Sequence, residues 1–134
     1  MTNIKLDLSG TWDGIYFYKD VPDAGPATPF LAIIRETDGA FTGTVIEPHE
    51  LRAATISATI FGHRQGTRVQ FAKDYECDDE EYRETVQYTG ELCTKGQMIS
   101  GEWAIEHWSG RFEMTRATGL AETVEGKESA EVDL

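Results

Sequence analysis

The chain has 134 residues, of which 40% are hydrophobic, and a formal net charge of −12 at pH 7. Its length fits one domain with one hydrophobic core. The excess of acidic residues repels nucleic acids and anionic membranes, so neither is expected as a partner. Two cysteines, Cys77 and Cys93, are too few for a disulfide framework. Met1–Leu8 alternates polar and apolar residues instead of forming a continuous apolar stretch, which favours a cytoplasmic location.

Short runs rich in β-branched and aromatic residues alternate with Gly, Asp and Pro, a pattern typical of β-strands. In chain order, eight strands are predicted: Gly10–Tyr18, Pro29–Glu36, Ala40–Glu47, Ala53–Phe61, Thr67–Tyr75, Tyr82–Cys93, Gln97–Glu106 and Trp108–Arg116. Their connections are too short for parallel crossovers, so neighbouring strands should pair antiparallel. Closure of the sheet would remove both free edges. We therefore expect an all-β fold, an eight-stranded antiparallel up-and-down β-barrel, with a two-sheet sandwich as the alternative.

This barrel is expected to occupy residues 1–117 as a single domain. Residues 118–134 are mostly Glu, Ala and Lys and have almost nothing to bury. We expect them to form an acidic, disordered tail.

The connections between the predicted strands differ in length in a regular way. Those after the second, fourth and sixth strands are tight and contain glycine: Asp38–Gly39, His63–Gly66 and Thr94–Gly96. Those after the first, third and fifth strands are longer: Lys19–Thr28, Pro48–Arg52 and Glu76–Glu81. One end of the barrel should thus be closed by tight turns, and the other should be a mouth under long loops. Ligand sites commonly lie at barrel mouths and on such loops.

Side-chain alternation assigns an inward face to most of the strands. The second strand cannot be assigned in this way, because Phe30–Ile34 is apolar throughout. Five glycines fall on inward faces: Gly14, Gly43, Gly90, Gly101 and Gly110. They either bend the strands of a small barrel or leave room for a ligand.

Short motifs at the two ends of the predicted barrel resemble those of the calycins, the group that contains lipocalins, fatty-acid-binding proteins and avidins. Gly10-Thr11-Trp12 is similar to the calycin GxW motif, and Arg116 to the arginine that packs on that tryptophan in lipocalins. Gly39–Thr44 resembles the third-strand segment of avidins. Trp108–Met114 resembles the last strand of a bacterial family of uncharacterised function, which reads Trp-Ser-Gly-x-Phe-x-Met. The resemblance implies a calycin-like barrel whose closed end is plugged by Trp12 and Arg116.

The avidin resemblance does not extend to biotin. Avidins bind the ureido group with Asn and Ser on strand one and Tyr on strand three, and the matching positions here are approximately Gly14, Tyr18 and Val45. Only Trp103 matches a tryptophan of the avidin pocket. Tight binding of this kind needs preorganised polar groups, so we do not expect biotin as the ligand.

Several inward-facing polar and aromatic residues should lie toward the mouth. The predicted ligand-binding residues are Tyr16, Tyr18, Glu47, Phe71, Lys73, Glu84, Tyr88 and Trp103. In a regular hairpin Lys73 lies opposite Glu84, and the two should form a cross-strand ion pair. The ligand would be small and apolar or amphipathic. A packed interaction or homo-oligomerisation module is the alternative, and an enzyme using Lys73, Glu47 or Glu84 is a third.

Metal and cofactor sites are not expected. His49, His107 and Cys77 fall on three separate mouth-side loops and include no short-spaced pair of ligands. The acidic run Cys77–Glu81 lacks the ligand spacing and the turn glycine of an EF-hand. The chain contains neither a nucleophile elbow nor a phosphate-binding glycine loop.

Overall fold

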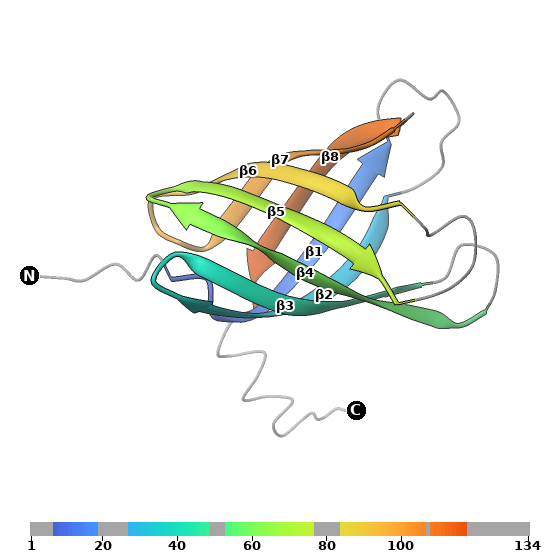
Figure 1. The fold of residues 1–134 in the computed structure, drawn as a ribbon, viewed down its shortest axis with the longest axis horizontal. Helices are drawn as coiled ribbons and strands as arrows, with labels where there is room; N and C mark the ends of the chain where they lie inside the picture. The colour runs from blue at the N-terminus through green and yellow to red at the C-terminus, as the bar shows by residue number, and fades with distance from the viewer. Residues whose placement is uncertain (1–6, 19–26, 49–52, 77–83, 107, 118–134) are drawn as a thin grey trace, which may run out of the picture.

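The computed structural model describes residues 7–18, 27–48, 53–76, 84–106 and 108–117. These contain eight strands: β1 (Gly10–Tyr18), β2 (Thr28–Thr37), β3 (Ala40–Pro48), β4 (Thr55–Gln65), β5 (Arg68–Tyr75), β6 (Val86–Leu92), β7 (Met98–Ile105) and β8 (Trp108–Arg116). Each strand pairs antiparallel with its neighbour in the chain, and β8 pairs with β1, so that the sheet closes (Figure 1). The prediction of an eight-stranded up-and-down barrel is confirmed.

β4 ends four residues beyond the predicted end at Phe61, because the sequence pattern places the turn at His63. The strand instead continues to Gln65, because His63 pairs with Ala40 on β3 and Gln65 pairs with Arg68 on β5. Sequence pattern favoured an early turn because His63–Gly66 is polar. Two flanking strands extend β4 through these polar residues.

The alternation of β2 that the sequence left open is settled by the barrel. Phe30, Ala32 and Ile34 are buried inside, whereas Leu31 and Ile33 face outward. Glu36 continues the inward series and is also buried. One strand therefore places apolar side chains on both faces of the sheet, and this is why its pattern could not be assigned.

The inward glycines do not leave empty space in the barrel. A Cβ at Gly14 would clash with the Phe30 ring, and a Cβ at Gly90 would meet the Phe112 ring at 3.0 Å. At Gly110 a Cβ would clash with the Phe17 carbonyl oxygen and lie 2.6 Å from Trp103 Nε1. That indole nitrogen donates to the Phe17 oxygen at 3.0 Å. Rings and backbone of neighbouring strands occupy this space, so the glycines serve barrel packing.

The three tight hairpins lie at one end of the barrel, on the left in Figure 1. Trp12 is fully buried at this end, and its Nε1 donates to the Leu8 carbonyl at 2.9 Å. The Arg116 guanidinium lies 4.4 Å from the Trp12 ring centroid, which confirms the predicted cation–π pair. Arg116 also donates to the carbonyl oxygens of Asp7, Ser9 and Gly96, at 2.9, 2.9 and 3.1 Å.

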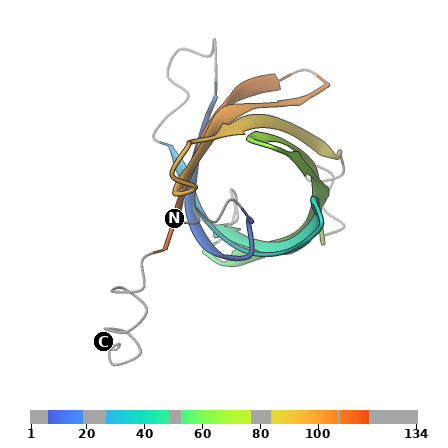
Figure 2. The same cartoon turned by 90° about the vertical axis from the view of Figure 1, so that its left-hand side faces the viewer.

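A second polar cluster at the closed end was missed in the sequence. The Glu36 carboxylate accepts from Arg64 Nε and Nη2, at 2.9 and 2.7 Å, and from the backbone N–H of Leu8 at 2.9 Å. Burial alone would raise the pKa of Glu36, but the hydrogen bonds and the charge of Arg64 outweigh it and lower that pKa. Together these bonds hold the N-terminal residues Asp7–Ser9 across the end of the barrel, as Figure 2 shows in blue.

Within the described part of the chain, no helix is long and apolar enough to span a membrane.

Candidate functional site

The middle of the barrel is filled by aromatic side chains. The rings of Phe71 and Tyr88, on neighbouring strands β5 and β6, stack with centroids 4.5 Å apart and planes 7° apart. Phe112 on β8 meets both edge-on, at 5.9 and 5.1 Å. These contacts form a solid layer between the closed end and the mouth. Two predicted ligand-binding residues, Phe71 and Tyr88, thus belong to the core and form the floor beneath the mouth.

A buried ion pair lies next to this floor on its mouth side. Lys73 Nζ of β5 is 3.1 Å from Glu47 Oε2 of β3, and the two side chains are only 3% and 1% exposed. The two residues come from strands separated by β4, and they meet because both side chains point into the barrel. Removing two charges from water is costly unless hydrogen bonds satisfy both groups. A contribution to stability therefore does not explain why this ion pair is buried in the barrel.

Aromatic rings surround the Lys73 ammonium group. Its Nζ lies 4.6 Å from the Tyr75 ring centroid, 5.1 Å from Tyr16, 5.3 Å from Tyr88 and 6.0 Å from Phe30. Such distances allow cation–π attraction in a site with little water. Tyr75 and Phe30 were not among the predicted site residues. Phe30 could not be assigned because the alternation of β2 was ambiguous, whereas the inward phase of β5 was enough to indicate Tyr75.

The two oxygens of the Glu47 carboxylate differ in their hydrogen bonding. Oε2 accepts from Lys73, but the buried Oε1 has no hydrogen-bond partner among the described residues. A buried acceptor without a donor costs about 1–3 kcal/mol. Such groups are rare in folded proteins and commonly mark a site where water or a ligand binds.

A small internal cavity lies beside the Lys73 side chain. It has a volume of about 10 Å³ and is lined by Phe30, Val45, Ile60, Phe71, Lys73, Tyr88 and Met114. This is room for roughly one water molecule. Any larger molecule held by the pair would have to lie on the mouth side of Lys73, since the floor below is packed.

The charge of Glu47 also affects the neighbouring tyrosines. Burial raises the pKa of the Tyr75 hydroxyl far above its usual range, and Glu47 raises it further by its charge and by a hydrogen bond. Burial and the same charge raise the pKa of Tyr88. Both hydroxyls therefore stay protonated over the physiological range and remain hydrogen-bond donors.

The predicted pairing of Lys73 with Glu84 is wrong. Lys73 lies opposite Val86 in the register of β5 and β6, and Glu84 precedes β6 in an exposed position. β6 begins at Val86 and not at Tyr82, and the register of the two strands is shifted by two residues from the expected one. Lys73 instead reaches across the interior to Glu47.

The remaining predicted residues near the mouth are aromatic: Tyr16 and Trp103 are buried, and Tyr18 is half-buried. Tyr18 packs edge-on against Trp103 with centroids 5.0 Å apart, and Tyr16 does so at 5.9 Å. Trp108 meets Tyr18 at 5.8 Å, and its side chain is 48% exposed. Tyr18, Tyr75 and Ile105 are partly buried against the core. Seven of the eight predicted residues therefore lie in or beside one cluster, and Glu84 stands apart.

Several candidates of the sequence analysis fall outside the described residues. These are His49, His107, Cys77, the acidic run 77–81 and the tail 118–134. Among the residues that are described, no group of three or more His, Cys, Asp or Glu side chains is placed to hold a metal ion.

Comparison with known proteins finds neither a family model nor a curated protein that matches this chain.

Proposed function

We propose that this calycin-like barrel binds a small amphipathic molecule at its mouth, on the Lys73–Glu47 pair. The observation that carries the proposal is the buried Oε1 of Glu47, to which no described residue donates a well-formed hydrogen bond. Burying a carboxylate in an aromatic interior lowers the stability of the fold, and an oxygen that accepts no hydrogen bond lowers it further. A ligand that donates a hydrogen bond to this oxygen would remove the cost when it binds.

The surroundings of the pair favour a particular ligand chemistry. Glu47 Oε1 requires a donor such as an amine, an amide or a hydroxyl group. The rings of Tyr18 and Tyr75, half-buried above the pair, offer an apolar wall for the rest of the molecule. The cavity of about 10 Å³ supports a molecule that sits above Lys73 instead of one enclosed deep in the barrel.

The similarity to lipocalins and avidins, and the cytoplasmic location, belong to the same proposal. The closed barrel and the Trp12–Arg116 plug support the first. The acidic composition and the low cysteine content support the second.

Tryptophan fluorescence can test the proposal, because Trp103 and Trp108 both contact the mouth residue Tyr18. The probes are a set of small aromatic amines, amides and alcohols. We expect at least one to change the emission of the wild-type protein saturably. The double variant Lys73→Met/Glu47→Leu should weaken that binding at least about tenfold, equal to about 1.4 kcal/mol.

Glu36→Gln is the matched control, since it alters an equally buried carboxylate at the opposite end of the barrel. Its affinity for the same probe should equal that of the wild type. The proposal fails if no probe binds the wild-type protein, or if the double variant binds as well as the wild type does.

A further inference from the structure

The outer surface of β2, β3 and β4 is unusual for so acidic a protein. Among the outward-facing residues of Thr28–Thr37, Ala40–Pro48 and Thr55–Gln65, all of which the structure describes, none is Asp or Glu. Arg35 is the one strongly basic residue among them. The whole chain carries a net charge of −12, so its acidic residues are concentrated elsewhere. We call this surface of β2–β4 the acid-free face.

Exposed apolar side chains gather on the same face. Of the seven large hydrophobic side chains that are exposed in the described residues, four lie here: Leu31, Ile33, Ile46 and Phe61. Leu31 and Ile46 lie directly opposite each other on β2 and β3. Ile33 is 52% and Phe61 45% exposed. Clusters of this kind, unlike single exposed residues, mark interaction sites.

Acidic residues border the face without entering it. Asp13 on β1 lies opposite Leu31, and Asp74 on β5 lies opposite Thr59. Glu76 accepts a hydrogen bond from Thr59 Oγ1 at 2.6 Å at the same border. An apolar centre with a charged rim is the anatomy of a protein–protein interface.

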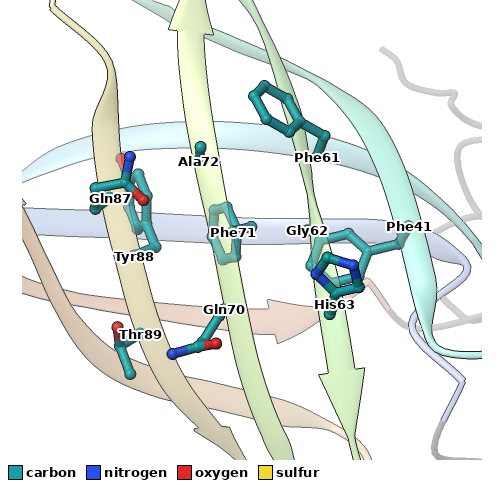
Figure 3. A pocket seen from close by; sticks show the side chains of 10 residues that line it. All are labelled: Phe41, Phe61, Gly62, His63, Gln70, Phe71, Ala72, Gln87, Tyr88 and Thr89. Carbon is teal, nitrogen blue, oxygen red and sulfur yellow. The ribbon is translucent and has the colours of Figure 1, made fainter.

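The face carries a projecting ring and a hollow, and a second hollow lies beside it. A hollow of about 400 Å³ is lined by Ile33, Ile34, Arg35, Thr42, Gly43, Thr44 and Thr59. A second hollow, of about 450 Å³, is lined mostly by residues of β5 and β6, beside the face, and Phe61, Gly62 and His63 of β4 form its border (Figure 3). The Phe61 ring lines this second hollow, and Phe61 pairs with Thr42, which lines the first. A projecting ring thus stands between two depressions that small residues leave open.

We propose that the acid-free face binds a second copy of this chain around a two-fold axis, with Phe61 of each copy entering a hollow of the other. In a two-fold dimer the same face of both copies forms the interface. The projection of each copy therefore meets the hollow of the other, so that the contact is made twice. The charge distribution permits a second copy to bind at this face. Two molecules of charge −12 repel each other, and the acid-free face lets them approach without placing carboxylates against carboxylates in the centre.

The size of the face sets the expected strength. Three strands about 4.8 Å apart, with about nine residues of about 3.3 Å each, give a face of about 400 Å² per copy. Interfaces of this size are at the weak, transient end of the range. We therefore expect a dimer that dissociates on dilution and that strengthens at high salt, because salt screens the repulsion between the two acidic molecules.

Sedimentation velocity on the full chain, from about 1 µM to about 1 mM, tests the proposal across the range expected of a weak interface. The wild-type protein should shift from monomer to dimer over this range, and added NaCl should move the shift to lower concentration. Phe61→Glu should raise the dissociation constant at least tenfold. Ile33→Glu, at the other side of the face, should do the same.

Phe17→Glu is the matched control, because Phe17 is an outward aromatic residue of similar exposure on β1. Circular dichroism would show whether each variant keeps the barrel. The proposal is overturned by a wild-type protein that stays monomeric throughout, by Phe17→Glu weakening association as much as Phe61→Glu does, or by a dimer that salt disrupts.

Discussion

The two ends of the barrel each bury a carboxylate with a basic partner, yet they treat it differently. At the closed end, Glu36 accepts three hydrogen bonds, from two nitrogens of Arg64 and from the N–H of Leu8. Toward the mouth, Glu47 accepts from Lys73 through Oε2 and is also hydrogen-bonded to Tyr75, whereas its Oε1 has no well-formed hydrogen bond from any described residue. The first arrangement fastens the chain across an opening, and the second keeps an unsatisfied acceptor in an aromatic interior.

This difference indicates which end is built for stability and which for binding. A satisfied buried polar network rigidifies a fold, whereas a partly satisfied one is less stable than an apolar core. At the closed end, substitutions that break the Glu36–Arg64–Leu8 hydrogen bonds should lower the stability of the barrel. The mouth end should become more stable when its polar pair is removed.

The largest expected effect is at the closed end. Arg64→Met would leave the Glu36 carboxylate buried with the Leu8 N–H as its one remaining partner among the described residues. Breaking one side of such a pair costs about 3–5 kcal/mol in the free energy of unfolding. Urea denaturation at neutral pH measures this loss. A cost below about 1 kcal/mol, typical of an exposed ion pair, would contradict the network.

The next effect concerns the packing between the two ends. Gly110→Ala would push a Cβ into the Phe17 carbonyl oxygen and the Trp103 indole. We expect a loss of about 1–3 kcal/mol, because overpacking forces backbone shifts. The hydrogen bond from Trp103 to Phe17 should be lost as well, which would shift the tryptophan emission.

Gly66→Ala is the control for this substitution, because a Cβ there meets nothing within 4 Å. Gly66 has a φ of +62°, so alanine should cost about 1 kcal/mol through the backbone alone. Its tryptophan emission should stay unchanged. Equal losses in the two variants would argue against the close packing at Gly110.

A smaller effect is expected in acid. The folded state lowers the pKa of Glu36, so the carboxylate stabilises the fold above the ordinary carboxyl value of 4.5. That contribution should be lost as pH falls from 4.5 through the lowered pKa. Urea denaturation of the wild type and of Glu36→Gln should show a steeper acid dependence in the wild type. Parallel pH curves would contradict the role of Glu36.

At the mouth end, the pH dependence of stability should appear at alkaline pH. Tyr75 and Tyr88 have raised pKa values in the folded state, so the stability they provide below pH 10 is lost as the pH rises above that value. Absorbance at alkaline pH should show these two tyrosines ionising only when the barrel unfolds. Their ionisation in a folded barrel, judged by circular dichroism, would show that water reaches them.

Much of this architecture could be predicted from the sequence. Alternation in Ile56, Ala58 and Ile60 placed β4, and the Trp12–Arg116 contact followed from the closure of β1 onto β8. Both depend on local pattern or on strand order. Glu36 could have been recognised once the inward phase of β2 was known, since an inward acid needs a partner.

The candidate site was harder to predict from the sequence than the fold, because its contacts join strands that are not neighbours in the sheet. Lys73 and Glu47 meet across the interior, and a hairpin register cannot reveal such a contact. The ambiguity of Phe30–Ile34 had a different cause: Leu31 and Ile33 are apolar although they face outward. Because the acid-free face places apolar residues on the outside of β2, the usual polar–apolar alternation is absent from this strand.

Two double variants show most directly whether the Lys73–Glu47 pair is kept at a cost to stability. Lys73→Met/Glu47→Leu should raise the free energy of unfolding by about 1–2 kcal/mol, because an apolar pair replaces a half-satisfied ionic one. Glu36→Leu/Arg64→Met should lower it by about 2 kcal/mol, because the buried N–H of Leu8 loses its acceptor. Urea denaturation of both variants beside the wild type gives the two values. If the mouth variant loses as much stability as the closed-end variant, the Lys73–Glu47 pair stabilises the fold and is not kept at a cost to stability.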